Sequence, residues 1–165
     1  MGRDEEDDCF YHTQLIEAYN KYGTTILGGV MTENPEDALK YGFAKGSTMP
    51  DGAIKIEELI EKPGIEKKPS NLAIVSGQVY SPDIFEALEE AGQSVEPGKE
   101  LVYIDGVNKL REKGGEAYAV EIKGGKYYDC GSVTQYLKTN IEMALRRPKI
   151  GEEMLAFIKE IAKNQ

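Results

Sequence analysis

Residues 127–132 read Tyr-Tyr-Asp-Cys-Gly-Ser and lead directly into an amphipathic run that extends to Arg147. This pattern predicts a short strand, a turn at Gly131 and a helix, because Ser132 can act as an N-cap and accept a first-turn backbone N–H. Asp129 would then stand at the carboxyl end of a strand, where ligands collect in open α/β sheets. It is therefore a candidate metal or substrate contact, and the alternative is a carboxylate that only caps a helix or faces solvent.

Outward from this stretch, strand patterns alternate with helix patterns. The run Leu72 to Val75 is apolar without interruption, as in a strand that is buried on both faces. The alternation predicts an α/β layered fold with a largely parallel or mixed sheet flanked by helices. Apolar spacing predicts helices at 13–22, 84–92, 101–110, 133–147 and from 152 onward, and strands at 24–31, 71–80 and 116–122.

The composition limits the classes of partner. The chain of 165 residues carries a formal charge of -9, and its basic residues are scattered, so we expect no nucleic-acid partner. It has no apolar run long enough to cross a bilayer and no signal-peptide pattern, so we expect no membrane partner and a cytoplasmic location. Two distant cysteines, Cys9 and Cys130, and a single histidine, His12, favour neither a zinc site nor a histidine-dependent triad.

The start of the chain differs from the rest. Asp4, Glu5, Glu6, Asp7 and Asp8 form an acidic cluster, which predicts a flexible, solvated N-terminus over 1–12, with a metal-binding remnant as the alternative. Residues 13–165 are expected to belong to one domain or to part of a larger one.

A second charged pair stands beside a proline, in the sequence Glu61-Lys62-Pro63. Proline disfavours the helical region for the residue before it, so Lys62 is predicted to be extended at a strand end. There, Glu61 could accept hydrogen bonds while Lys62 supplies a positive charge to a common ligand. The alternative is a solvated loop, since further charges lie at Glu66, Lys67 and Lys68.

Several motifs, taken in order, resemble one family. These are Gln14 to Glu17, Lys40-Tyr41-Gly42, Ile60 to Pro63, Ser70 to Val75, Tyr128 to Gly131 and Tyr136 to Asn140. Their order and spacing resemble the bacterial and archaeal UTP:glucose-1-phosphate uridylyltransferases, which are sugar nucleotidyltransferases. The similarity spans about 14–159 and covers only the family's second half. It therefore implies the C-terminal portion of a nucleotidyltransferase fold, with a partial Rossmann-like mixed sheet.

The resemblance implies roles for four residues. Glu61 would accept hydrogen bonds from glucose hydroxyls, and Lys62 would hold the sugar phosphate as a point charge. Gly42 would let the backbone approach the sugar, and Asp129 would ligate Mg²⁺. The implied catalytic residues are thus Lys62 and Asp129, the substrate-binding residues are Gly42, Glu61 and Lys62, and the partners are glucose 1-phosphate and UTP or UDP-glucose.

The Gly-rich loop of the family's nucleotide-binding half is not found in the sequence, and a phosphate cradle needs such successive N–H groups. We therefore expect a C-terminal part that is truncated or separately encoded, and inactive without the nucleotide half. The alternative is a non-catalytic sugar-nucleotide-binding or association module, favoured by Val102 and Ile104 where the family usually has polar residues. Half a sheet would leave an open edge and an uncovered apolar face, so we expect a homo-oligomer or a separate N-terminal half as partner.

Overall fold

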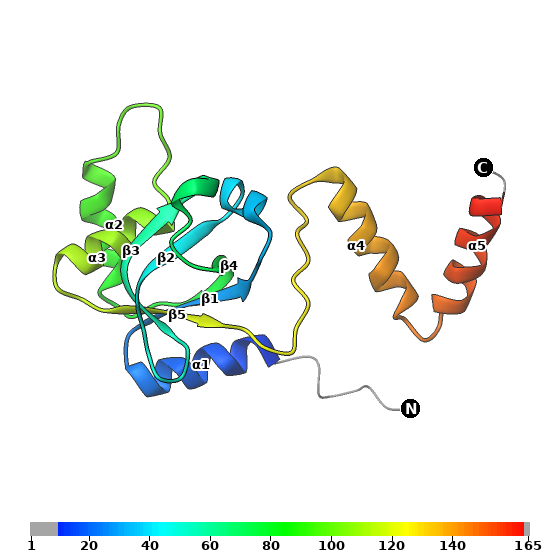
Figure 1. The fold of residues 1–165 in the computed structure, drawn as a ribbon, viewed down its shortest axis with the longest axis horizontal. Coiled ribbons are helices and arrows are strands. Elements are labelled where there is room, and N and C mark those ends of the chain that lie inside the picture. Colours follow the sequence, from blue (N-terminus) through cyan, green and yellow to red (C-terminus); the bar gives the residue numbers. More distant parts are fainter. Residues whose placement is uncertain (1–9, 164–165) are drawn as a thin grey trace. The chain divides into compact units, whose positions relative to one another are not determined.

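The computed structural model describes residues 10–163, and the acidic cluster and Cys9 lie outside them. The chain divides into two units, Met1–Gly125 and Lys126–Gln165. Figure 1 shows the order of the elements along the chain. The first unit contains α1 (Phe10–Tyr22), β1 (Thr25–Met31), η1 (Pro35–Leu39), β2 (Gly42–Thr48), β3 (Ile54–Glu61), η2 (Ile65–Lys67), β4 (Leu72–Val79), α2 (Ile84–Gln93), α3 (Tyr103–Glu112) and β5 (Ala117–Glu121). The second contains α4 (Val133–Leu145) and α5 (Gly151–Lys163).

The five strands form one closed sheet in the order β1-β4-β2-β3-β5. β1 and β5 are parallel, and the other neighbouring strands are antiparallel. The expected mixed sheet flanked by helices is confirmed. Within residues 10–163 the expected open edge is closed at one end, because β5 pairs with β1 along one side and with Ile54 and Lys55 of β3 along the other, whereas the rest of β3 has no second strand neighbour.

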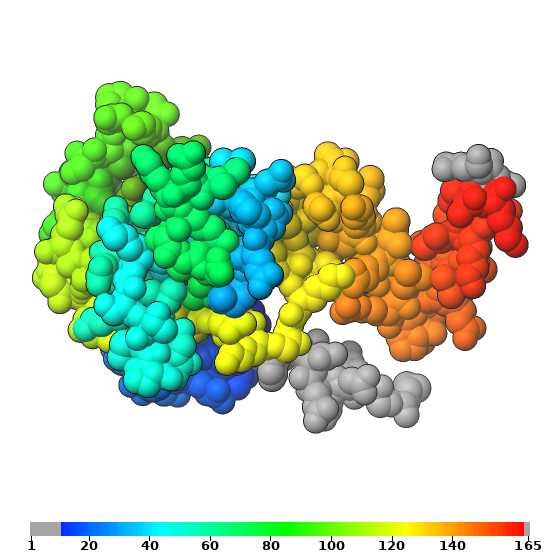
Figure 2. Space-filling model, in the orientation of Figure 1, coloured from blue at the N-terminus to red at the C-terminus, as the bar shows by residue number. Residues whose placement is uncertain are grey.

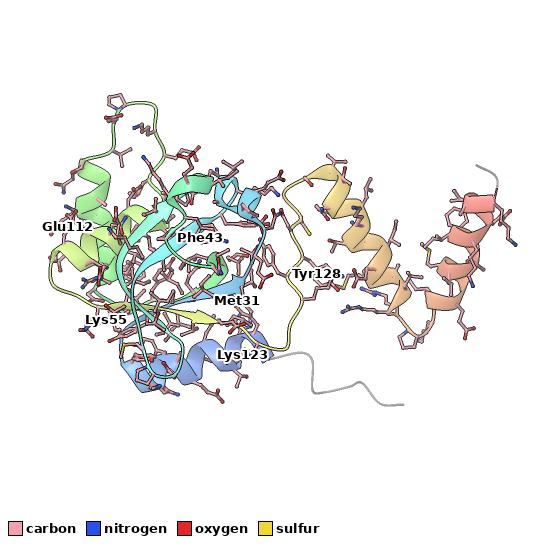
Figure 3. All side chains as sticks on the ribbon, viewed as in Figure 1. Met31, Phe43, Lys55, Glu112, Lys123 and Tyr128 are labelled. Atoms are coloured by element: carbon pink, nitrogen blue, oxygen red, sulfur yellow. The ribbon has the colours of Figure 1, made fainter. Side chains whose placement is uncertain are left out.

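β4 shows why the sheet is covered on both faces. Leu72, Ala73, Ile74 and Val75 are all buried, and successive residues of a strand point to opposite faces. Leu72 and Ile74 join the main core, whereas Ala73 packs with Phe43, which is fully buried on β2 (Figure 3). The prediction that this apolar run is a strand buried on both faces is thus confirmed.

Helices cover the sheet from two sides. Figure 1 shows α2 and α3 side by side, and their buried side chains join the main core. α1 lies against β1 because Gly28 leaves room: a Cβ atom there would stand 2.3 Å from the Tyr11 hydroxyl oxygen. That hydroxyl instead donates a hydrogen bond to the Ser76 carbonyl at 2.8 Å. Glycine at this position therefore sets how closely the helix approaches the strand.

The Asn108 side chain hydrogen-bonds α3 to the part of β3 that has no second strand neighbour among the described residues. The Asn108 amide donates to the Leu59 carbonyl at 2.9 Å, and its oxygen accepts from the Leu59 N–H at 2.8 Å. The amide thereby replaces the neighbouring strand that Leu59 lacks. This contact fixes the position of the helix relative to the last residues of the strand.

The second unit contains a pair of helices that follows an irregular segment. Ser132 caps α4 as predicted, because its Oγ accepts from the Gln135 N–H at 3.3 Å. The strand predicted before Asp129 is wrong: residues 126–130 have no ladder partner within 10–163. Side chains hold the segment instead, since Lys126 and the Tyr128 hydroxyl bind Glu142 at 2.6 and 2.8 Å.

Among the described residues, no helix is long and apolar enough to cross a membrane.

Replacing Asn108 with alanine tests the contact between α3 and β3. Asn108→Ala leaves the Leu59 N–H and C=O without partners, and we expect a loss of about 1–2 kcal/mol of unfolding free energy in urea, followed by circular dichroism. Asn20→Ala on the exposed face of α1 is the matched control and should change stability by less than about 0.5 kcal/mol. Equal effects of the two substitutions would contradict the role of Asn108.

A pH dependence follows from Asp51, at the tip of the β2–β3 hairpin. Its carboxylate accepts hydrogen bonds from Lys21 and Tyr22 of α1, and these hold the pKa of Asp51 well below its usual range. A lowered folded-state pKa gives stability that is present above the unfolded-state value, about 4, and is lost as the pH falls.

We therefore expect Asp51→Asn to lower the urea midpoint at neutral pH, and the gap from the wild type to narrow at about pH 3.5. Asp83→Asn, outside this contact, is the control: the difference between its urea midpoint and that of the wild type should be the same at both pH values. A gap that stays constant between the two pH values would refute the role of Asp51.

Candidate functional site

The first part of the site is the direct pair between Gly42, which begins β2, and Glu61, which ends β3. Gly42 is buried, and a Cβ atom at this position would stand 3.2 Å from Glu61 Oε2 and 3.0 Å from Ile104 Cδ1. The absence of a side chain at Gly42 thus lets the Glu61 carboxylate and Ile104 approach its backbone, where a Cβ atom would crowd both. The structure brings together these two residues, for which the resemblance implied a role in sugar binding.

Lys62 follows at once, in an uncommon conformation. Its φ is +46°, the left-handed region, so the extended conformation expected before Pro63 is wrong. Two backbone hydrogen bonds hold the chain there, from the Lys62 N–H to the Tyr41 carbonyl and from the Gly64 N–H to the Ala38 carbonyl, both at 3.1 Å. Such strain is often found at functional sites.

The turn brings the Lys62 ammonium back beside its neighbour. Lys62 Nζ lies 3.5 Å from Glu61 Oε1, and the two side chains are 57% and 47% exposed. An ion pair in water at this exposure contributes only about 0–1 kcal/mol. Lys62 can therefore leave Glu61 for a phosphate group at little cost, and the same pair presents an acceptor and a cation to one ligand.

Two tyrosines near this pair form what we call the aromatic wall, because Tyr103 interacts electrostatically with both Glu61 and Tyr80. Tyr80 follows β4, Tyr103 begins α3, and both are half-buried against the main core. Burial raises the pKa of Tyr103, and the nearby negative charge of Glu61 raises it further. Burial also raises the pKa of Tyr80. Both phenols are therefore neutral at physiological pH and can donate a hydrogen bond.

Local sequence patterns did not single out this aromatic wall, although one signal was available. Tyr103, Val107 and Leu110 have the spacing i, i+4, i+7 of one helix face, which places the tyrosine on the buried side of the predicted helix. A hydroxyl on that face, at the helix start, indicates a polar group at the edge of the core.

Asp129 belongs to the second unit, whereas Gly42, Glu61 and Lys62 belong to the first. It is half-exposed, and its Oδ1 accepts a hydrogen bond from the Gly131 N–H at 2.8 Å. No group of three histidine, cysteine or acidic side chains is arranged to hold a metal ion anywhere in the described residues. Asp129 thus offers one carboxylate, which suits Mg²⁺ when phosphates and water supply its other ligands.

A separate cleft of about 380 Å³ lies beside the segment that joins α2 to α3, which projects from the first unit in Figure 2. Its charged lining consists of four carboxylates and two lysines, and both lysines are already paired with carboxylates of the cleft. An anionic sugar phosphate would be repelled there. These side chains are Glu96, Glu100, Asp105, Glu112, Lys99 and Lys109.

Curated proteins show what the chain resembles. It is 39% identical over 128 residues to a UTP–glucose-1-phosphate uridylyltransferase of Pseudomonas aeruginosa, covering 76% of this chain and 43% of the relative. It is 33% identical over 157 residues to a protein of that name from Staphylococcus epidermidis, covering 94% of this chain and 52% of the relative. The chain thus spans about half the length of these relatives.

Comparison with solved structures points to the same kind of protein. A crystal structure of UDP-glucose pyrophosphorylase complexed with UDP-glucose matches with a TM-score of 0.72 and 32% identity, over 89% of this chain and 53% of that chain. The family model for nucleotidyl transferases matches residues 6–145, which is most of the sequence. The chain therefore belongs to the nucleotidyl transferase family.

Proposed function

We propose that this chain is the C-terminal, sugar-phosphate-binding part of a glucose-1-phosphate uridylyltransferase. The observation that carries the proposal is the arrangement of Gly42, Glu61 and Lys62, a backbone without a side chain beside an acceptor and a half-exposed cation. The names of the relatives supply the substrates, UTP and glucose 1-phosphate, with UDP-glucose and pyrophosphate as products.

Each residue has a task in this reaction. Glu61 accepts hydrogen bonds from sugar hydroxyls, and Lys62 moves from Glu61 to the sugar phosphate as a point charge. Gly42 lets the sugar approach the backbone. Asp129 supplies one carboxylate to Mg²⁺, which neutralises phosphate charge when bound. A sugar-phosphate oxygen then attacks the α-phosphorus of UTP and pyrophosphate leaves, so positioning and charge stabilisation suffice and no side-chain nucleophile is required.

A second candidate is a non-catalytic sugar-nucleotide-binding or association module. One observation favours it: Ile104 brings an apolar methyl group to within 3.0 Å of the Gly42 Cβ position, beside the proposed sugar contact. An apolar group there can narrow the pocket without replacing a hydrogen bond. Retained binding without turnover in any assembly would favour this role.

Activity is expected to need the nucleotide-binding half. The chain mixed with UTP, glucose 1-phosphate and Mg²⁺ should release no pyrophosphate above background in a coupled assay. Addition of the part of the Pseudomonas aeruginosa relative that this chain does not match should restore release, and Asp129→Asn should abolish the restored activity. Robust release by the chain alone would contradict the requirement for a second half.

Lys62 gives a test that separates binding from stability. Lys62→Gly relieves the left-handed conformation and should stabilise the chain by about 1 kcal/mol, whereas Lys62→Ala should not. Both should weaken glucose 1-phosphate binding at least 10-fold by calorimetry, because the phosphate loses its cation. Lys67→Ala, on the neighbouring exposed helix η2, is the control and should bind normally. Normal binding by both Lys62 variants would exclude Lys62 from the site.

A further inference from the structure

The wall formed by Tyr80 and Tyr103 has polar groups that the fold itself does not use. Within residues 10–163, neither phenol hydroxyl makes a hydrogen bond to another side chain or to the backbone. Both rings are nevertheless half-buried against the main core. Neither hydroxyl is among the buried, unpartnered side-chain atoms of the described residues, so both can be reached by water, and a ligand hydroxyl can take the place of that water.

The register between α3 and β3 brings Tyr103 to the site. Asn108 is bonded to Leu59, and Ile104, one helical turn earlier, lies at the Gly42 position opposite Glu61. Going back from Asn108 to Ile104 covers about 6 Å of helix, and going forward from Leu59 to Glu61 covers about 6.6 Å of strand. The start of α3 and the end of β3 therefore lie at the same level. Tyr103 is therefore placed at the Glu61 end of the strand, in agreement with the effect of Glu61 on its pKa.

Both tyrosines stand on fixed backbone. The Asp105 carboxylate accepts from the Val102 N–H at 3.0 Å, which fixes the start of α3. The Thr25 hydroxyl oxygen accepts from the Ser81 N–H at 3.1 Å, which ties the residue after Tyr80 to β1 in the buried interior. Rings on such supports lose little entropy when they bind a ligand.

We propose that Tyr103 is a specificity-determining residue, whose hydroxyl hydrogen-bonds a ring hydroxyl of the hexose in a hexose 1-phosphate held by Glu61 and Lys62. Tyr80 extends the same wall. The inference rests on the proposed function, because it takes the Gly42, Glu61 and Lys62 arrangement to be the sugar-phosphate site. A carboxylate accepts from sugar hydroxyls and a neutral phenol both donates and accepts, so the two together can read one edge of the ring.

Tyr103→Phe tests the hydroxyl while it keeps the ring and its packing. We expect glucose 1-phosphate to bind this variant about 3- to 10-fold more weakly than the wild type by calorimetry, the loss of one neutral hydrogen bond. Tyr118→Phe is the matched control: its phenol lies outside the site and donates to Glu116 at 3.1 Å. It should bind glucose 1-phosphate as the wild type does.

The 2-, 3-, 4- and 6-deoxy analogues of glucose 1-phosphate identify the partner hydroxyl. The analogue without that hydroxyl should bind the wild type and Tyr103→Phe equally, whereas the others should keep the difference. The same penalty with every analogue would overturn the inference. Binding that is lost in Lys62→Ala but unchanged in Tyr103→Phe would overturn it and leave the proposed function standing. No binding to the wild type would overturn both.

Discussion

The pairing of Gly42 with Glu61 is the constraint on which the site depends. It joins the first residue of β2 to the last residue of β3, so the ladder itself delivers the carboxylate to the end of the hairpin. A Cβ atom at Gly42 would crowd both Glu61 and Ile104 of α3, and these side chains would have to shift to admit it. The absence of a Cβ atom therefore lets the strand, the helix and the carboxylate meet at one point. β3 ends at Glu61, and the turn that contains Lys62 begins at once.

Stability and function draw on different contacts around this point. The closed sheet and its cores hold this end of the hairpin without help from Glu61 and Lys62, since both are half-exposed and their ion pair contributes little. Asn108 fixes the helix to the strand through backbone groups that have no other strand neighbour. The buried part thus carries two phenols beside the Glu61 carboxylate, while the Lys62 side chain is half-exposed. The proposed reaction would use this division, because it relies on positioning.

The second unit uses another device. Glu142 on α4 accepts hydrogen bonds from Lys126, the Tyr128 hydroxyl and Arg146, and these contacts lower its pKa. These side-chain contacts, and not a β-ladder, hold the segment before Asp129 in place. Asp129 itself turns the chain by accepting the Gly131 N–H. The carboxylate is therefore oriented by local chemistry within its own unit.

The sequence by itself determined much of the local structure. The Ser132 cap, the apolar run in β4 and the helix that begins at Ile84 follow from neighbouring residues, because capping and burial periodicity are local. The ordered motifs also indicated the family, since Glu61-Lys62-Pro63 and Tyr128 to Gly131 keep their spacing.

Tertiary structure decided what depends on distant partners. Tyr127 and Tyr128 favour a strand locally, yet a strand needs a neighbour, and within residues 10–163 the segment has none. Pro63 disfavours a turn at Lys62, but hydrogen bonds to Tyr41 and Ala38 impose one. The closure of the sheet by β5, and the position of Tyr103 beside Glu61, arise from pairings between residues far apart in the chain, which no local pattern specifies.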